Sequence, residues 1–141
     1  MAGRILGIDL GEKRIGLALS DPQGIIASPF GKIEYRNDEQ MLSEIEKLTR
    51  ERDVSEIVVG YPIRTSGNKG KPAQRAEAVA RMLKERLKIQ THLFDERMST
   101  RAAEQVLLSG DLSREKRREK IDQVSASLIL QAFLEYRRTK I

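Results

Sequence analysis

The 141-residue sequence contains no cysteine, no tryptophan and a single histidine. The absence of cysteine excludes disulfide bonds, thiolate nucleophiles and thiolate metal ligands. Aromatic residues make up 4% of the chain, which argues against a nucleic-acid surface built mainly on base stacking. No apolar stretch approaches the length of a membrane span, so no membrane association is expected. A catalytic or metal site must therefore be built chiefly from carboxylates, hydroxyls and basic side chains.

Charge, by contrast, is abundant. Charged residues form 33% of the sequence, and 26 lysines and arginines exceed 21 acids, which gives a net charge of +5. This modest excess permits binding to nucleic acid without requiring it. The chain shows no linker, internal repeat or low-complexity segment, so a single domain over residues 1–141 is expected. The first residues carry no apolar run, so no signal peptide is expected.

The first strand and the turn after it organise the rest of the chain. Residues on both faces of this strand are mostly apolar, which is typical of a central strand covered on both sides. The exception is Asp9, which shares a face with Gly7. A second apolar run follows, and Gly11 permits a tight connection, so residues 4–20 are predicted to form an antiparallel hairpin. A buried carboxylate is costly unless a cation or a donor meets it, so Asp9 marks a candidate metal site.

The remaining pattern predicts a three-layer α/β fold. The first expected elements are a strand over 25–33, at an edge or bulged because of Pro29 and Gly31, and a helix from Asn37 or Asp38 to about Arg52. They are followed by a parallel strand around Ile57–Val59, a helix opening at Pro72 and a strand over Thr91–Phe94. The last two are a helix from Ser99 or Thr100 to about Leu108 and a helix from about Ile121 to Arg138. The apolar stripe of the last helix is predicted to be Ile121, Val124, Leu128, Ala132, Phe133 and Tyr136. Three early strands followed by helix–strand units indicate a mixed five-stranded sheet with helices on both faces.

Acidic residues occupy three places where the apolar pattern does not require them. Asp9 lies on the central strand, Asp95 and Glu96 follow another strand, and Asp122 lies in the first turn of the last helix. Small residues after Asp122 would let that helix press onto the small-residue face of the hairpin, close to Asp9. Each acid alone has an ordinary explanation, as a turn cap, a helix-dipole partner or a local ion pair. Together they indicate a metal site.

A cluster of carboxylates has defined chemical consequences. Two carboxylates about 4 Å apart repel by roughly 4 kcal/mol at an effective dielectric of 20, so the cluster must share protons or bind cations. Oxygen ligands without histidine or cysteine favour Mg²⁺ or Mn²⁺. Two such ions support phosphodiester hydrolysis, because one activates water and the other stabilises the leaving oxygen.

Four motifs, in order along the chain, resemble the YqgF/RuvX family. They are Gly7-Ile8-Asp9-Leu10-Gly11, Val59-Gly60-Tyr61-Pro62, Asp95-Glu96-Arg97-Met98-Ser99-Thr100, and Asp122 with Ser125-Ala126. That family is similar to Holliday junction resolvases of the RuvC type and has the ribonuclease H-like fold. The resemblance implies a cytoplasmic bacterial nuclease that matures the 5′ end of pre-16S ribosomal RNA, with Asp9, Glu96 and Asp122 as catalytic residues and ligands of Mg²⁺ or Mn²⁺, two ions being expected.

Several alternatives stay open at this level. Lys69, Lys71 and Arg97 are expected to hold phosphates of a ribosomal RNA precursor, with ribosomal particles as further partners. The same site in a two-fold dimer would suit a four-way DNA junction, and a non-catalytic nucleic-acid-binding module is a third hypothesis. The first motif also resembles a phosphate motif of sugar kinase–actin ATPases, which need further motifs. The sequence leaves open endo or exo cleavage, monomer or homodimer, and whether Asp95 or Glu96 binds metal.

Overall fold

The computed structural model describes residues 3–62, 70–98 and 114–139, of which 114–123 are described by their backbone alone. The elements in chain order are β1 (Arg4–Leu10), β2 (Arg14–Ser20), β3 (Ala27–Glu34), α1 (Asp38–Glu51), β4 (Val54–Tyr61), α2 (Lys71–Leu87), β5 (Gln90–Asp95), the 3₁₀ turn η1 (Glu96–Met98) and α4 (Arg114–Thr139). No helix in these described ranges is long and apolar enough to cross a membrane.

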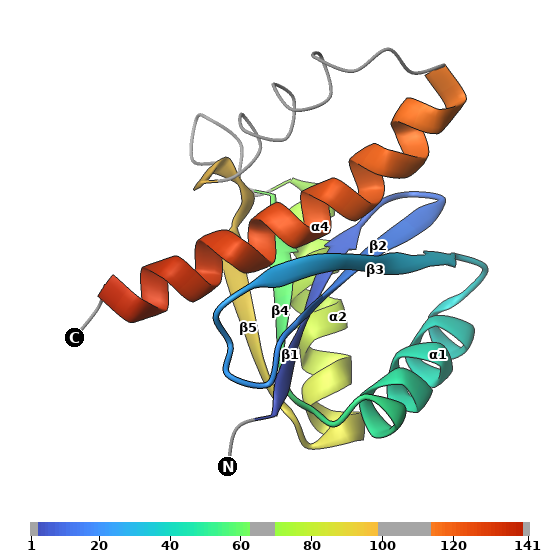
Figure 1. Cartoon of the computed structure of the whole chain (residues 1–141). Helices are drawn as coiled ribbons and strands as arrows, with labels where there is room; N and C mark the ends of the chain where they lie inside the picture. The colour runs from blue at the N-terminus through green and yellow to red at the C-terminus, as the bar shows by residue number, and fades with distance from the viewer. Residues whose placement is uncertain (1–2, 63–69, 99–113, 140–141) are drawn as a thin grey trace.

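The five strands form one mixed sheet in the order β3-β2-β1-β4-β5. Strand β1 pairs antiparallel with β2 and parallel with β4, which in turn pairs parallel with β5. The predicted hairpin at the sheet centre is therefore confirmed. Because β1, β4 and β5 are parallel, their carboxyl ends meet at one edge of the sheet (Figure 1).

Helices cover both faces of the sheet, as predicted. Helices α1 and α2 lie on one face, and α4 crosses the other face obliquely (Figure 1). Alternate residues of β1 divide between the two cores: Leu6 and Ile8 pack on the α1/α2 side, and Ile5 packs on the α4 side. The period-two pattern of the sequence thus gives the correct face for each residue, including the α4 side for Asp9.

Most element ends agree with the prediction. Strand β3 is both an edge strand and irregular, since its pairing with β2 shifts register between Leu17 and Ala18. Asn37 caps α1, its side chain accepting a hydrogen bond from the Gln40 amide at 2.8 Å. The strand predicted around Ile57–Val59 is longer than expected, because Gly60 and Tyr61 continue β4 as paired residues. The short helix expected over 99–108 lies outside the described residues.

The last helix differs from the prediction in its start and in its buried face. It begins at Arg114, because the charged residues that follow are strong helix formers and extend it beyond its apolar part. From residue 124 onward its buried side chains are Ala126, Ser127, Ile129, Leu130, Phe133 and Leu134. Ile121, the first residue of the predicted stripe, lies where the structure describes the backbone alone. Leu128 and Ala132 are only half-buried, and Tyr136 is 43% exposed. The inward side of the helix therefore combines small residues, which allow close contact with the sheet, with large apolar residues that fill the core.

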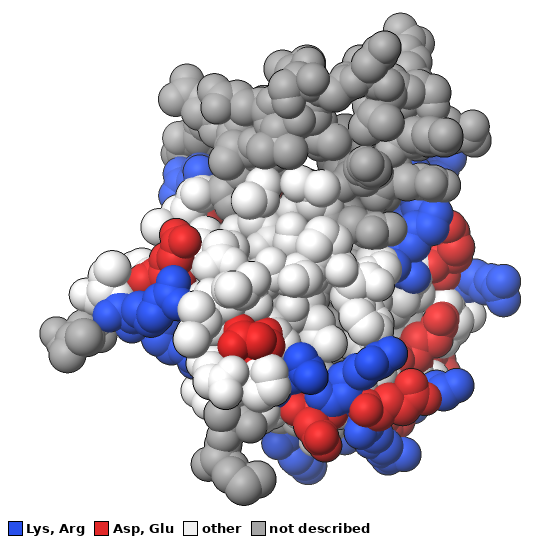
Figure 2. Space-filling model, viewed as in Figure 1, with Lys and Arg blue, Asp and Glu red and all other residues white. Residues whose placement is uncertain are grey.

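Charged side chains of both signs are mixed on the outer surface of α1. Figure 2 shows them at the lower right, where Figure 1 places this helix. Arg86 of α2 bonds Glu39 at 2.8 Å, and Arg50 bonds Glu46 at 3.2 Å. The excess positive charge is therefore not gathered into a one-sign patch on this side of the molecule.

Candidate active site

Asp9 lies half-buried near the carboxyl end of β1, on the face covered by α4. Its neighbour across the β1–β2 pair is Gly16. On the other side, Ile8 pairs with Val59, so Gly60 is the next residue of β4 beside Asp9. Glycines on both neighbouring strands leave the space around the carboxylate free of strand side chains. The sequence signals this only through glycine at strand positions, and the strand predicted around Ile57–Val59 does not include Gly60.

Glu96 joins Asp9 in that space. It is the first residue of η1, directly after β5, and its side chain lies over the backbone of Gly60. A Cβ added at Gly60 would be 2.6 Å from Oε1 of Glu96 and 3.0 Å from its Cγ. The Glu96 carboxyl is hydrogen-bonded to that of Asp9. Two acids separated by more than eighty residues in the sequence thus meet.

The contact between the two acids changes their protonation. Burial raises the pKa of Glu96 to about 8, and the hydrogen bond to Asp9 and the charges of Asp9 and Asp95 act in the same direction. The pair therefore shares a proton at neutral pH, as close carboxylates do without a cation. A divalent cation bound by both oxygens would take the place of this proton, so the donor set fits a hard metal ion.

Asp95 is bound by Arg97. The guanidinium Nε and Nη2 of Arg97 donate to Asp95 at 2.9 Å and 2.7 Å, and the Arg97 backbone amide donates at 2.9 Å. The hydrogen bond from Arg97 lowers the pKa of Asp95. Of the two acids that the sequence could not separate, the structure therefore brings Glu96, and not Asp95, to Asp9.

Helix α4 lies close against β1 beside the two acids. A Cβ on Gly7 would be 2.9 Å from Cβ of Leu130 and 3.2 Å from the carbonyl oxygen of Ala126. This contact confirms that the helix packs on the small-residue face of the hairpin. Asp122 lies on α4, one turn before Ala126, and its side chain is outside the described part of the structure. Its role as a third acid stays a prediction, and no three acids or histidines converge among the described residues.

Two of the three predicted phosphate-binding residues lie in the described part of the structure. Lys71 is exposed at the first position of α2, and the Arg97 side chain is 47% exposed while it binds Asp95. Lys69 lies outside the described residues. The lone histidine, His92, lies on β5 and bonds Glu56 at 2.8 Å.

Comparisons with solved structures give the fold. T. thermophilus RuvC in complex with a Holliday junction substrate matches with a TM-score of 0.64 at 11% identity, over 98% of this chain and 97% of that one. The yeast mitochondrial Holliday junction resolvase Ydc2 matches with a TM-score of 0.59 at 12% identity, over 97% and 80%. The fold is therefore the ribonuclease H-like fold of RuvC-type resolvases, as predicted.

Comparisons of sequence give the family. A protein from Moorella thermoacetica named "Putative pre-16S rRNA nuclease" is 46% identical over 132 residues, which are 94% of each chain. A protein of the same name from Syntrophomonas wolfei is 45% identical over 132 residues, again 94% of each. The family model described as RuvX, Holliday junction resolvase, matches residues 3–136. The chain belongs to the RuvX family.

Proposed function

We propose that this protein is a divalent-metal-dependent nuclease that hydrolyses phosphodiester bonds of RNA and matures the 5′ end of pre-16S ribosomal RNA. The observation that carries the proposal is the contact between the carboxyl groups of Asp9 and Glu96 at the carboxyl edge of the sheet. Curated relatives that cover 94% of the chain carry the corresponding name. Such a substrate would place the protein in the cytoplasm, with ribosomal particles among its partners.

Asp9, Glu96 and Asp122 are the residues that would hold Mg²⁺ or Mn²⁺, with two ions expected. When bound, the ions would activate water and stabilise the leaving oxygen of the phosphodiester. The chain itself supplies the position: the end of β1 fixes Asp9, and the missing side chain of Gly60 lets Glu96 fold back toward it. Lys69, Lys71 and Arg97 would hold neighbouring phosphates by charge-assisted hydrogen bonds.

The direct test is cleavage of a 5′-extended 16S precursor with Mg²⁺ or Mn²⁺ by the wild type and by Asp9→Asn. The variant keeps the shape of the side chain and removes its charge, so we expect a normal fold and a loss of at least about 100-fold in kcat. Glu12→Gln is the matched control, because Glu12 is an exposed acid in the turn after β1. Full cleavage by Asp9→Asn would remove Asp9 from the mechanism.

A second candidate substrate is the four-way DNA junction. The family description and the RuvC-like fold favour it. A junction cutter must act as a two-fold dimer that makes paired nicks. Light scattering and a panel of junction DNA, single strands and structured RNA separate the two: a monomer that prefers RNA supports the ribosomal substrate. Binding of RNA with no turnover in any metal would instead indicate a non-catalytic module.

A further inference from the structure

Arg75 of α2 reaches across to the turn that follows β1. Its Nη1 donates to the carbonyl oxygen of Gly11 at 2.6 Å, and its guanidinium lies over the ring of Tyr35, 4.9 Å from the ring centroid. Gly11 is two residues after Asp9. Arg75 thus joins α2, on one face of the sheet, to the end of β1. The Asp9 carboxylate of that strand lies on the opposite face.

Other bonds hold the same turn. The Gly11 amide donates to the Arg14 carbonyl at 2.9 Å, and the Tyr35 amide donates to the Lys13 carbonyl at 2.9 Å. The turn also needs glycine, since a Cβ on Gly11 would collide with the Arg14 carbonyl oxygen. Arg75 is the contact that connects this network to α2.

The Arg75 contact also carries a cost. Its Nη2 is buried and has no hydrogen-bond partner among the described residues. An unsatisfied buried donor is unfavourable, and native proteins keep few of them. The hydrogen bond to Gly11 and the contact with the Tyr35 ring offset this cost.

The turn of α2 that contains Arg75 also holds β4, the strand beside β1. The Tyr61 hydroxyl donates to Glu77 of α2 at 2.5 Å. Tyr61 follows Gly60, the residue over which Glu96 lies. Helix α2 is therefore bonded to the ends of both strands that position the acid pair.

We infer that Arg75 is a positioning residue for the active site: through Gly11 it fixes the end of β1 and thereby the place of Asp9 relative to Gly60 and Glu96. This inference rests on the proposed function. Arg75 does not touch the acids, and its effect on the reaction runs through the backbone. Its loss should weaken metal binding and the chemical step while leaving substrate affinity unchanged.

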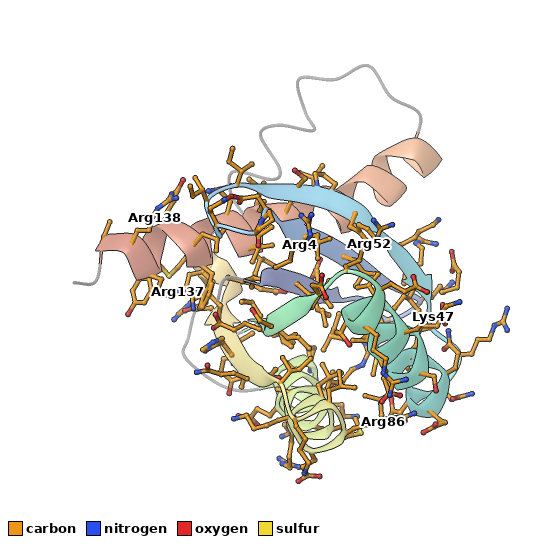
Figure 3. All side chains as sticks on the ribbon, turned by 60° about the horizontal axis from the view of Figure 1, so that its bottom comes forward. Arg4, Lys47, Arg52, Arg86, Arg137 and Arg138 are labelled. Carbon is orange, nitrogen blue, oxygen red and sulfur yellow. The ribbon has the colours of Figure 1, made fainter. Side chains whose placement is uncertain are left out.

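The test compares Arg75→Met with Arg86→Met, the same substitution on the same helix. Arg86 bridges α2 to Glu39 of α1, where the two helices lie side by side (Figure 3). Arg75→Met should make the Gly11 amide exchange with solvent about tenfold faster. It should also weaken Mn²⁺ binding in calorimetry and lower kcat, each about tenfold, with KM unchanged. Arg86→Met should leave all of these at wild-type values.

The outcomes separate this inference from the proposed function. Wild-type Mn²⁺ affinity and kcat in Arg75→Met would overturn the inference even if the turn exchanges faster. A wild-type protein that neither binds Mn²⁺ nor cleaves RNA would overturn the proposed function, and the inference with it. Should Arg75→Met fail to fold, Arg75→Lys against Arg86→Lys takes its place: smaller losses in the same direction support the inference, and identical behaviour of the two variants overturns it.

Discussion

The side chain of Glu96 occupies the place that a side chain at position 60 would fill. A Cβ on Gly60 would lie 2.6 Å from Oε1 of Glu96 and 2.9 Å from Cδ1 of Ile129. Gly60→Ala should therefore push Glu96 away from Asp9 and weaken Mn²⁺ binding about tenfold or more, measured by calorimetry. Gly31→Ala is the control, since nothing lies within 4 Å of a Cβ there. Equal Mn²⁺ affinity in the two variants would contradict this arrangement.

The close contact between Gly7 and α4 predicts a loss of stability on substitution. A Cβ at this position would be 2.9 Å from Cβ of Leu130 and 3.2 Å from the Ala126 carbonyl oxygen, so the helix must shift outward. Gly7→Ala should lower the free energy of unfolding by about 1–3 kcal/mol, measured in urea. An unchanged unfolding midpoint would show that α4 does not press on β1 as described.

The shared proton predicts how stability depends on pH. The pKa of Glu96 is about 8 in the fold against an ordinary 4.5, because burial and Asp9 disfavour its charged form. Between these two values the folded protein keeps a proton that the unfolded chain releases, so without metal its Tm should fall as the pH rises. Asp9→Asn should make the fall shallower, and Mg²⁺ should raise Tm more at pH about 8 than at pH about 5. A wild-type Tm that rises across this range would contradict the shared proton.

Glu56 predicts a stability effect away from the acid pair. It accepts hydrogen bonds from Arg137 of α4 at 2.7 Å and from His92 at 2.8 Å. Burial opposes its charge, but the bonds from Arg137 and His92 outweigh this effect and lower the pKa of Glu56. Glu56→Gln should cost about 1–3 kcal/mol at neutral pH, and the difference should disappear as acid protonates Glu56 below its ordinary pKa.

The control for Glu56 is Glu51→Gln on α1. Its carboxylate is 56% exposed and lies 3.9 Å from Lys47, so its removal should be nearly neutral. Urea titrations of both variants across pH measure the difference. A cost for Glu56→Gln that persists unchanged at low pH would show that its charge does not stabilise the fold.

The sequence predicts the central hairpin better than it predicts the end of β5. Alternation along residues 4–20 places Asp9 on the correct face, because side chains of a strand must alternate. The choice between Asp95 and Glu96 was not predictable from the same rule, since one residue of uncertainty in a strand end exchanges the two faces. In the structure Glu96 is the acid that reaches Asp9, because the missing side chain of Gly60 leaves room for it.

The errors in α4 and the role of Arg75 have a common physical reason. The stripe predicted from helical spacing includes Leu128 and Ala132, whereas the close contact at Gly7 turns Ala126 and Leu130 toward the sheet. Arg75 carries no pattern signal, because its partner is a backbone carbonyl sixty-four residues away in the sequence. Contacts of this kind depend on the assembled fold and cannot be read from local periodicity.

We propose that the acids hold divalent metal where Asp9 and Glu96 meet. Anomalous diffraction from crystals soaked in Mn²⁺ tests it directly. The predicted result is a peak about 2 Å from carboxylate oxygens of both residues, with Asp122 as a further ligand. A peak bound by neither Asp9 nor Glu96, or no peak in crystals that bind Mn²⁺ elsewhere, would contradict the metal-dependent mechanism.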